Sequence, residues 1–418
     1  MGRMKDYMRE LPDEILEKII SYLPLNEAAA TSILSTRWRH LWKTVDYPIF
    51  DIDIQRLISI NRRNKSLGEK RIFCLVSAIL DQYQGSTIDE LRIRFPHTSV
   101  VNFWSSDDMT PVISWINTAF QKRVKNLELD LQVFVRKAID IHSHLLPCNF
   151  ISLVSLRLVA LTYLSHSLIH YFLSNCPFLR ELYMERITSL PDLIICGPKL
   201  KHFTLIDSDV ESLEISAPNL VSFEFSNDIE PTICFKNTPS LKHVSLEGYD
   251  SYVPLVSGNL DPILNLVSHL DSLALTQSDE PEISWRRPFL NFPTLGSLKQ
   301  LQLSTCHYNA VALDTLILLL NASPELIKLS VIILEDEFGG SKSERNCFTM
   351  CSHHHHQRLE VVEIVGFGGS EREIEFAGCL ADYAAASIKK IIVHPGDSKA
   401  GLLQLRRRLP SAVKLHIF

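Results

Sequence analysis

A six-residue pattern, Leu-x-x-Leu-x-Leu with other aliphatic residues or Phe at its apolar positions, recurs along most of this 418-residue chain. The alternation in the second half of each copy predicts a short strand whose side chains point alternately inward and outward. One such strand cannot bury its leucines alone, so we expect the copies to stack into a parallel sheet with a continuous core. The clear copies begin at Leu153, Leu179, Leu200, Leu220, Leu241, Leu270, Leu298 and Leu326, and fainter ones at Ile88, Val124, Leu359 and Ile388.

The spacing of the copies predicts how each strand connects to the next. Copies from Leu179 to Leu241 start 20 or 21 residues apart, which leaves room only for extended or tightly turned return segments. From Leu241 onward the starts lie 28 or 29 residues apart, and residues 260–270 and 312–326 are predicted to be helices. A proline precedes the first leucine by two residues in several copies, where it fixes the backbone before the ladder needs a donor: Pro177, Pro198, Pro218, Pro239 and Pro324.

This sequence pattern is typical of a leucine-rich repeat, although an irregular one. The polar position after the strand is matched well only by Cys306, with Ser208 and Asp228 as weaker substitutes. We therefore expect the repeat class but not a regular curvature.

The first fifty residues follow another plan. Apolar side chains from Ile15 to Leu23 recur at helical spacing, Asn26 is a plausible N-cap for a second short helix, and Ser35-Thr36 can cap a third that carries Trp38 and Trp42. A core this small is marginal without a staple or a partner. The surplus apolar surface either docks on another polypeptide or packs against the rest of the chain, and residue chemistry alone leaves both open.

This segment resembles an F-box, through Leu11-Pro12-Asp13-Glu14-Ile15-Leu16, the break at Leu23-Pro24, and Arg37-Trp38-Arg39-His40-Leu41-Trp42. The resemblance implies that this chain binds a Skp-type adaptor, and through it a cullin, as the substrate receptor of a ubiquitin ligase. The resemblance implies that Leu41 and Trp42 anchor the F-box to the part of the chain that follows it. It also implies an adaptor-binding surface made of Leu11, Pro12, Ile15, Ile19, Leu23, Ile33, Leu34 and Trp38.

The remaining chain resembles plant-type F-box/leucine-rich repeat proteins with an FBD region, through DMTPVISWINTAFQKRVKNLELDL, LLPCNFISLVSLRL and the stretch from Leu359 to Val393. We expect an α/β chain: a small N-terminal three-helix F-box followed by an irregular leucine-rich repeat solenoid with a parallel sheet. The expected parts are an F-box (6–50), a connector to the first repeat (51–87), repeats (88–335), a flexible loop (336–356), the FBD region (357–400), and a C-terminal helix and strand (401–418).

Charge and composition exclude several classes of function. The net charge of -6 provides no basic field for nucleic acid, no apolar stretch approaches the length of a membrane span, and the odd, scattered cysteines argue against a disulfide framework. We therefore expect a protein of the cytoplasm or the nucleus without nucleic-acid or membrane partners.

Catalytic and metal motifs find little support. The run His353–His356 near Cys347 and Cys351 has ligands that suit zinc, but its spacing matches no common structural site, so a solvated loop is favoured. The glycine-rich stretch 366–369 lacks a phosphate-binding layout and is predicted to be a turn. We expect no enzyme activity and no cofactor.

Outward strand positions are the candidates for binding a target. As one wall of a solenoid they would form a mixed polar surface, and the residues chosen are Glu181, Tyr183, His202, Thr204, Glu224, His243, Gln300 and Gln302. The first hypothesis is a substrate-recognition subunit of a Skp–cullin–F-box ligase that holds an unknown target protein. The alternative is an adaptor-independent repeat scaffold or small-ligand sensor, and a zinc enzyme is a third.

Overall fold

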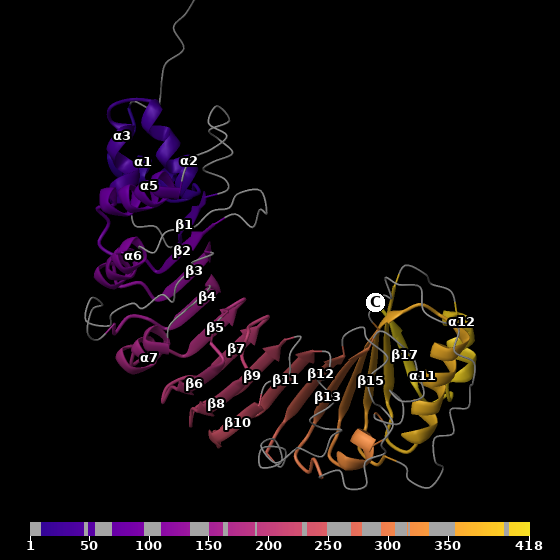
Figure 1. Cartoon of the computed structure of the whole chain (residues 1–418). Coiled ribbons are helices and arrows are strands. Elements are labelled where there is room, and N and C mark those ends of the chain that lie inside the picture. The colour runs from indigo at the N-terminus through magenta and orange to yellow at the C-terminus, as the bar shows by residue number, and fades with distance from the viewer. Residues whose placement is uncertain are drawn as a thin grey trace, which may run out of the picture. The chain divides into compact units, whose positions relative to one another are not determined.

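Two compact units make up the computed structural model, Met1–Val210 and Glu211–Phe418. Placement is described for residues 10–45, 49–54, 69–95, 110–133, 150–161, 166–188, 190–227, 232–248, 269–277, 294–305, 316, 318–333, 356–396 and 401–418. Figure 1 shows the elements in chain order.

The first unit begins with the expected short helices: α1 (Asp13–Ile20), α2 (Leu25–Ala30), the 3-10 turn η2 (Thr31–Ile33) and α3 (Trp38–Thr44). Pro12 and Pro24 stand at the N-cap positions of α1 and α2. The prediction that Asn26 caps the second helix is therefore wrong, because that helix already begins at Leu25. A proline just before a helix loses nothing, since its missing N–H would have no partner within the helix.

A parallel sheet follows in the same unit, in the order β1-β2-β3-β4-β5-β7. Its strands are β1 (Ile49–Asp53), β2 (Glu90–Arg94), β3 (Asn126–Val133), β4 (Ser155–Leu161), β5 (Glu181–Glu185) and β7 (His202–Ile206). The helices α5 (Glu69–Gln82), α6 (Thr110–Gln121) and α7 (His166–Asn175) connect successive strands, and β6 (Asp192–Cys196) lies between β5 and β7 in the sequence. The sheet thus begins with β1, which precedes the first repeat predicted from the sequence, at Ile88.

The second unit continues the same architecture, with parallel strands in the order β9-β11-β12-β13-β14-β15-β16-β17. They are β9 (Ser222–Ser226), β11 (His243–Gly248), β12 (Ser272–Gln277), β13 (Gln300–Thr305), β14 (Lys328–Ile333), β15 (Val361–Phe367), β16 (Lys390–Pro395) and β17 (Lys414–Ile417). Two further strands, β8 (Ser212–Ser216) and β10 (Thr232–Asn237), pair with each other in parallel. The helices with described bounds in this unit include α11 (Glu371–Tyr383) and α12 (Leu402–Arg408).

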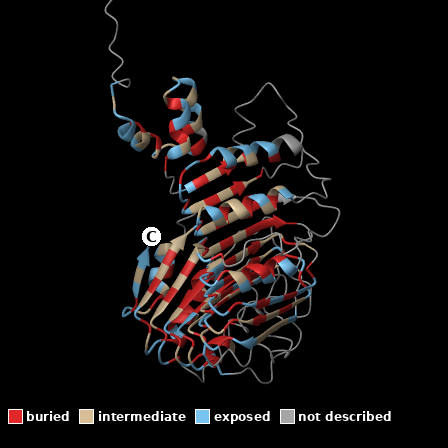
Figure 2. Ribbon diagram, turned by 90° about the vertical axis from the view of Figure 1, so that its left-hand side faces the viewer, coloured by how far each residue is buried: buried red, intermediate tan, exposed pale blue. Residues whose placement is uncertain are grey.

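Burial alternates along the strands as the repeat predicts. In β5, Leu182 and Met184 are buried while Glu181 and Tyr183 are not, and Figure 2 shows the same alternation on neighbouring strands. The register keeps equivalent leucines level, since Leu301 of β13 stands opposite Leu273 of β12 and Leu329 of β14. Stacked leucines of this kind form the continuous core that no single repeat could build.

The same hydrogen-bond pattern recurs at the start of successive strands, where two N–H groups donate to one carbonyl. The N–H groups of Arg180 and Glu181 both donate to the carbonyl of Val154, and those of Lys201 and His202 both donate to the carbonyl of Arg180. The same arrangement occurs in the second unit, where the N–H groups of Ile327 and Lys328 both donate to the carbonyl of Lys299. One carbonyl per repeat therefore fixes the register of the next strand.

The proline before each repeat lies in a tight turn. The N–H of Leu200 donates to the carbonyl of Gly197 across Pro198, and that of Leu241 donates to Thr238 across Pro239. Proline is favoured at the second position of such a turn because its backbone angle is already set. The prolines thus stabilise the turn that delivers the first leucine to the core.

The return segments agree with the predicted spacing where they are described. β6, β8 and β10 are extended, and the second predicted helix is helical at Leu316 and 318–322. Ser208 fills the polar position, donating to the carbonyl of Ile206 at 2.8 Å and accepting from the N–H of Ile187 at 3.1 Å. Cys306, Asp228, most of the first predicted helix and residues 336–355 lie outside the described residues.

The FBD region contains the predicted strand, glycine turn, helix and strand. Gly366 and Gly369 have φ values of 77° and 80°, which L side chains rarely adopt. Ser370 and Glu373 form a capping box at the start of α11, and the Glu373 carboxylate also accepts from the Gly368 N–H at 2.9 Å. Glu373 is only 5% exposed. Its carboxylate therefore links the glycine turn to the first turn of α11, where a negative charge complements the helix dipole.

No helix within the described ranges has the length and apolar character needed to cross a membrane. The cysteines for which placement is described, Cys74, Cys176, Cys196, Cys234 and Cys379, are free thiols. Burial raises the pKa of Cys176 to about 12, so this thiol stays protonated and unreactive at neutral pH.

Candidate functional site

The N-terminal helices have a small core of their own. Leu16 and Ile20 of α1 are fully buried, and α1 packs against α3, where Leu41 and Trp42 are buried as well. Trp38 is only 8% exposed. The prediction that Trp38 belongs to an adaptor-facing surface is not supported by this placement, because its indole is already covered within the free chain.

Other apolar side chains of these helices remain uncovered. Exposed fractions are 46% for Ile15, 75% for Tyr22, 87% for Ile33 and 64% for Leu34. Pro12 is exposed, while Leu11, Ile19 and Leu23 are half-buried. We call the eight residues the apolar face: Leu11, Pro12, Ile15, Ile19, Tyr22, Leu23, Ile33 and Leu34. A soluble chain rarely leaves this much aliphatic surface in water unless a partner covers it.

Hydrogen bonds bring the two ends of this face together. The Arg37 guanidinium donates to the Asp13 carboxylate at 2.5 Å and to the carbonyl of Leu11. The start of α1 is therefore held beside the junction of η2 and α3, which carries Ile33 and Leu34. Asp13 also stands in the first turn of α1, where its negative charge complements the helix dipole.

Tyr22 was missed by the sequence analysis. It follows Ile19 by three residues, so it extends the same helical stripe just past the end of α1. The Lys18 ammonium lies 5.2 Å from the centre of its ring, a cation–π contact that orients the phenol. The helical spacing from Ile19 would have indicated Tyr22 if aromatic residues had been counted with the aliphatic ones.

The helices are anchored to the following part of the chain through Lys43 and Val45, and the anchoring role predicted for Leu41 and Trp42 stays a prediction. The carbonyl of Lys43 accepts from the N–H groups of Gln84 and Gly85, at 2.7 and 3.1 Å. The Tyr83 hydroxyl donates to the carbonyl of Val45 at 3.0 Å from a buried position. One side of the helical segment is thus fixed to the first repeats while the apolar face stays open.

The outward strand surface of the first unit carries the first candidate target-binding residues. Glu181 lies opposite His202, and Tyr183 lies opposite Thr204. Glu181 and His202 are exposed, whereas Tyr183 and Thr204 are half-buried. The four predicted residues of this unit therefore form two adjacent rungs of one surface.

Tyr183 is held by groups that the sequence analysis did not select. The Arg157 guanidinium stacks 3.5 Å from the centre of the Tyr183 ring, and the phenol donates to Glu185 at 2.7 Å. Burial raises the pKa of Tyr183, so the hydroxyl stays a donor at physiological pH.

Charged pairs extend this surface across the earlier strands. Arg94 donates to Asp51 at 2.5 Å, Arg92 lies 3.7 Å from Glu128, and Arg157 lies 3.2 Å from Glu185. Burial raises the pKa of Glu128. Because the charges alternate in sign, the surface suits a polar protein partner with complementary charges better than a strongly charged ligand.

The second unit places its four candidates on two rungs, His243 with Gln300 and Glu224 with Gln302. His243 lies opposite Ser222 and Ser272, and Glu224 lies opposite Ser245. Gln300 lies opposite Ser272 and Gln302 opposite Ala274. Glu224, His243 and Gln300 are exposed, and Gln302 is half-buried.

Glu363, which the sequence analysis did not select, contacts three side chains on the outward surface of the second unit. Its carboxylate lies 2.5 Å from the Lys328 ammonium, accepts from the Ser330 hydroxyl at 3.0 Å and lies 3.1 Å from His394 Nε2. The hydrogen bond from Lys328 lowers the pKa of Glu363. The cluster depends on the register of β14, β15 and β16, which cannot be read from local sequence.

Metal binding finds no support in the described ranges, where no group of three or more His, Cys, Asp or Glu side chains gathers as a site. His356 is buried, with Nε2 2.9 Å from the carbonyl of Ser323 and Nδ1 accepting from the N–H groups of Arg358 and Leu359. Both ring nitrogens are therefore used within the protein. Cys347, Cys351 and His353–His355 lie outside the described residues.

Comparison with known proteins matches both parts of the chain. The family model described as At1g61320/AtMIF1, LRR domain, covers residues 79–399, and the F-box domain model covers residues 8–50.

Similar proteins of Arabidopsis thaliana include the F-box/FBD/LRR-repeat protein At5g22660, 27% identical over 56% of this chain and 55% of its own length. The Putative F-box protein At1g58310 is 26% identical over 59% of this chain and 55% of its own length. The Putative FBD-associated F-box protein At5g56390 is 26% identical over 92% of this chain and 93% of its own length.

The matched part of the chain spans about half the length of the first two of these relatives. The leucine-rich repeat model, in contrast, covers more than half of the chain itself. The chain therefore belongs to the At1g61320/AtMIF1 leucine-rich repeat family and is a plant-type F-box/leucine-rich repeat protein with an FBD region.

Proposed function

We propose that this protein is the substrate-recognition subunit of a Skp–cullin–F-box ubiquitin ligase. The single observation that carries the proposal is the apolar face, which stays exposed on the segment that matches the F-box model. The opposite side of that segment is anchored to the repeats through Lys43 and Val45. A fixed module with one uncovered aliphatic face is what adaptor docking requires.

The proposed role is positional and needs no catalytic residue in this chain. A Skp-type adaptor on the apolar face would connect the protein to a cullin, and the outward strand surface would hold a target protein. Catalysis would then follow from bringing the target close to the ubiquitin-loaded enzyme. The residues proposed to contact the target are Glu181, Tyr183, His202, Thr204, Glu224, His243, Gln300 and Gln302.

Co-purification with a Skp-type adaptor tests the proposal. The double variant Pro12→Ala/Ile15→Ala removes two exposed side chains of the apolar face, so it should abolish co-purification while the repeats stay folded. The variant Ile194→Ala, which truncates a 55% exposed side chain on β6, is the matched control and should retain the adaptor. Full binding by the double variant would refute the proposed interface.

Point variants distinguish the alternative, an adaptor-independent scaffold, better than deletion does. Removal of residues 1–50 would cut into β1 and would also take away Val45, whose carbonyl binds Tyr83. Function that persists in the double variant, after loss of adaptor binding has been shown, would favour the scaffold.

A further inference from the structure

Among the described strands of the second unit, β17 is last in the sheet order and has one unpaired edge. Within the described residues β17 pairs with β16 alone. The N–H groups of Lys414 and Phe418 donate to the carbonyls of Lys389 and Val393. Because successive residues of a strand turn their backbone groups to opposite sides, Leu415 and Ile417 turn theirs to the open edge. Such an edge is a template for one more strand.

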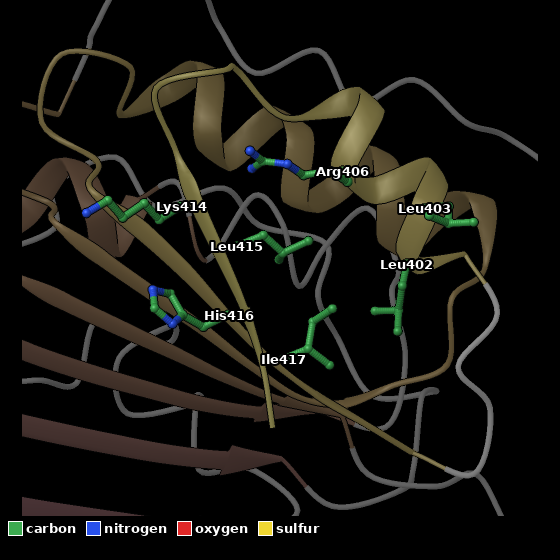
Figure 3. Close-up of a pocket in the computed structure, with 7 residues that line it drawn as sticks. All are labelled: Leu402, Leu403, Arg406, Lys414, Leu415, His416 and Ile417. Atoms are coloured by element: carbon green, nitrogen blue, oxygen red, sulfur yellow. The ribbon is translucent and has the colours of Figure 1, made fainter.

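A hollow of about 550 Å³ lies beside this edge, between β17 and α12. Leu402, Leu403 and Arg406 line it from the helix, and residues 414–417 line it from the strand. Figure 3 shows Leu415 and Ile417 pointing to the helix side and Lys414 and His416 pointing to the other side. Leu403 is 81% exposed and Ile417 is 49% exposed, so the hollow offers uncovered aliphatic surface.

The charge around the hollow has a single sign. Arg406 and Lys414 line it together with His416, and none of the acidic residues with described placement does. Arg406 donates to the carbonyl of Val413 at 2.8 Å, which holds its positive charge at the start of the strand. The nearby acids Glu375 and Asp382 are both paired with Arg408. This basic edge stands out in a chain whose net charge is -6.

The charge also decides between the occupants of the edge. A second copy of β17 would bring a second set of the same basic residues close to Arg406 and Lys414, and charged edge residues protect proteins against such self-pairing. An acidic strand converts the same repulsion into attraction. The side-chain alternation adds a second requirement, aliphatic residues that face the helix side.

We propose that the open edge of β17 is a docking site for an extended segment of a partner protein in which acidic residues alternate with aliphatic ones. The segment adds a strand to the sheet, its acidic side chains lie over Lys414 and His416, and its aliphatic side chains enter the hollow beside Leu402 and Leu403. The identification of that partner as a ligase target rests on the proposed function, whereas the binding itself does not require an adaptor.

Fluorescence anisotropy with the full chain tests the site in the absence of any adaptor. The probe is a labelled hexapeptide in which glutamate alternates with valine, and the comparison peptide has lysine in place of glutamate. The glutamate peptide should bind saturably and more weakly as salt is added, because the charges are exposed, and the lysine peptide should not bind.

Three variants locate the binding. Arg406→Glu/Lys414→Glu should weaken it about tenfold, and Ile417→Pro, which removes a donor from the open edge only, should weaken it by about the same factor. Lys199→Glu/Lys201→Glu makes the same change in net charge on exposed residues of the first unit and should leave the affinity unchanged. Thermal unfolding confirms that each variant is folded.

Equal affinity for both peptides, or binding that the edge variants leave unchanged, would overturn the proposal, and so would the absence of saturable binding. Self-association of the unmodified chain that Arg406→Glu/Lys414→Glu abolishes would assign the edge to a second copy instead. The variant Pro12→Ala/Ile15→Ala, which is expected to lose adaptor binding, should bind the peptide normally. Failure of the ligase proposal and failure of this site therefore give different results.

Discussion

Truncation of Ile33 and Leu34 to alanine should separate binding from folding. Both side chains are mostly exposed, at 87% and 64%, so their loss should change the free energy of unfolding by no more than about 0.5 kcal/mol. Their value lies in the surface that a partner would cover. The double variant Ile33→Ala/Leu34→Ala is therefore expected to fold normally and to lose affinity for a Skp-type adaptor.

The expected loss follows from the exposed fractions. Each truncation removes three carbon atoms, and a buried methylene contributes about 0.8 kcal/mol. Scaled by the exposed fraction, Ile33 contributes about 2 kcal/mol and Leu34 about 1.5 kcal/mol if the adaptor covers them fully. Together this corresponds to a rise in Kd of a few hundredfold.

Isothermal titration calorimetry with purified adaptor measures the affinity, and thermal denaturation measures the stability. The opposite pattern is expected for Leu16→Ala, because Leu16 is fully buried and its truncation should cost about 2–5 kcal/mol of folding stability. A change in Kd of less than threefold for Ile33→Ala/Leu34→Ala would refute the assignment of the apolar face. Unfolding of that variant would refute the exposed placement of the two residues.

Four further outcomes are expected in measurements of unfolding free energy. Glu373→Ala should destabilise the fold by about 3 kcal/mol, because two backbone N–H groups lose a charged acceptor, and Glu373→Gln should lose about half as much. Gly401→Ala should cost more than about 1 kcal/mol, since φ is 78° and the new Cβ would lie 2.4 Å from a carbonyl oxygen, whereas Gly296→Ala has nothing within 4 Å and should be neutral. The lowered pKa of Glu363 stabilises the fold above the ordinary carboxyl pKa and loses this effect as pH falls through the folded-state pKa, so Lys328→Met should flatten the acid side of the stability curve. His356→Phe should cost about 2 kcal/mol by leaving backbone groups unpaired, while a zinc chelator should not shift the unfolding midpoint of the unmodified protein; a chelator-induced shift would favour the zinc hypothesis.

The repeat core could be predicted because its signal is local. Leu182 and Phe203 are buried for the reason that the alternation gives, and Pro198 and Pro239 lie in turns that their spacing marks. The helical character of the first fifty residues was equally local. Their exposed aliphatic side chains agree with the surplus of apolar surface that the sequence indicates.

The parts that could not be predicted depend on partners far away in the sequence. β1 has no leucine pattern, and it becomes a strand because it pairs with β2 some forty residues later, at Ile49↔Glu90. Trp38 follows a helical stripe that fits either an interface or a core, and its low exposure depends on contacts that the local sequence does not fix. The clusters around Glu128 and Glu363 arise from register between separate repeats, as does the burial of His356 against Ser323.

The central claim is that the apolar face is the adaptor-docking surface of a module fixed to the repeats. Hydrogen–deuterium exchange of the full chain, with and without a saturating Skp-type adaptor, tests it most directly. The account predicts slower exchange from Leu11 to Leu34 and unchanged exchange in β5 and β13. Protection of the repeat strands with no change in α1 and η2 would contradict it.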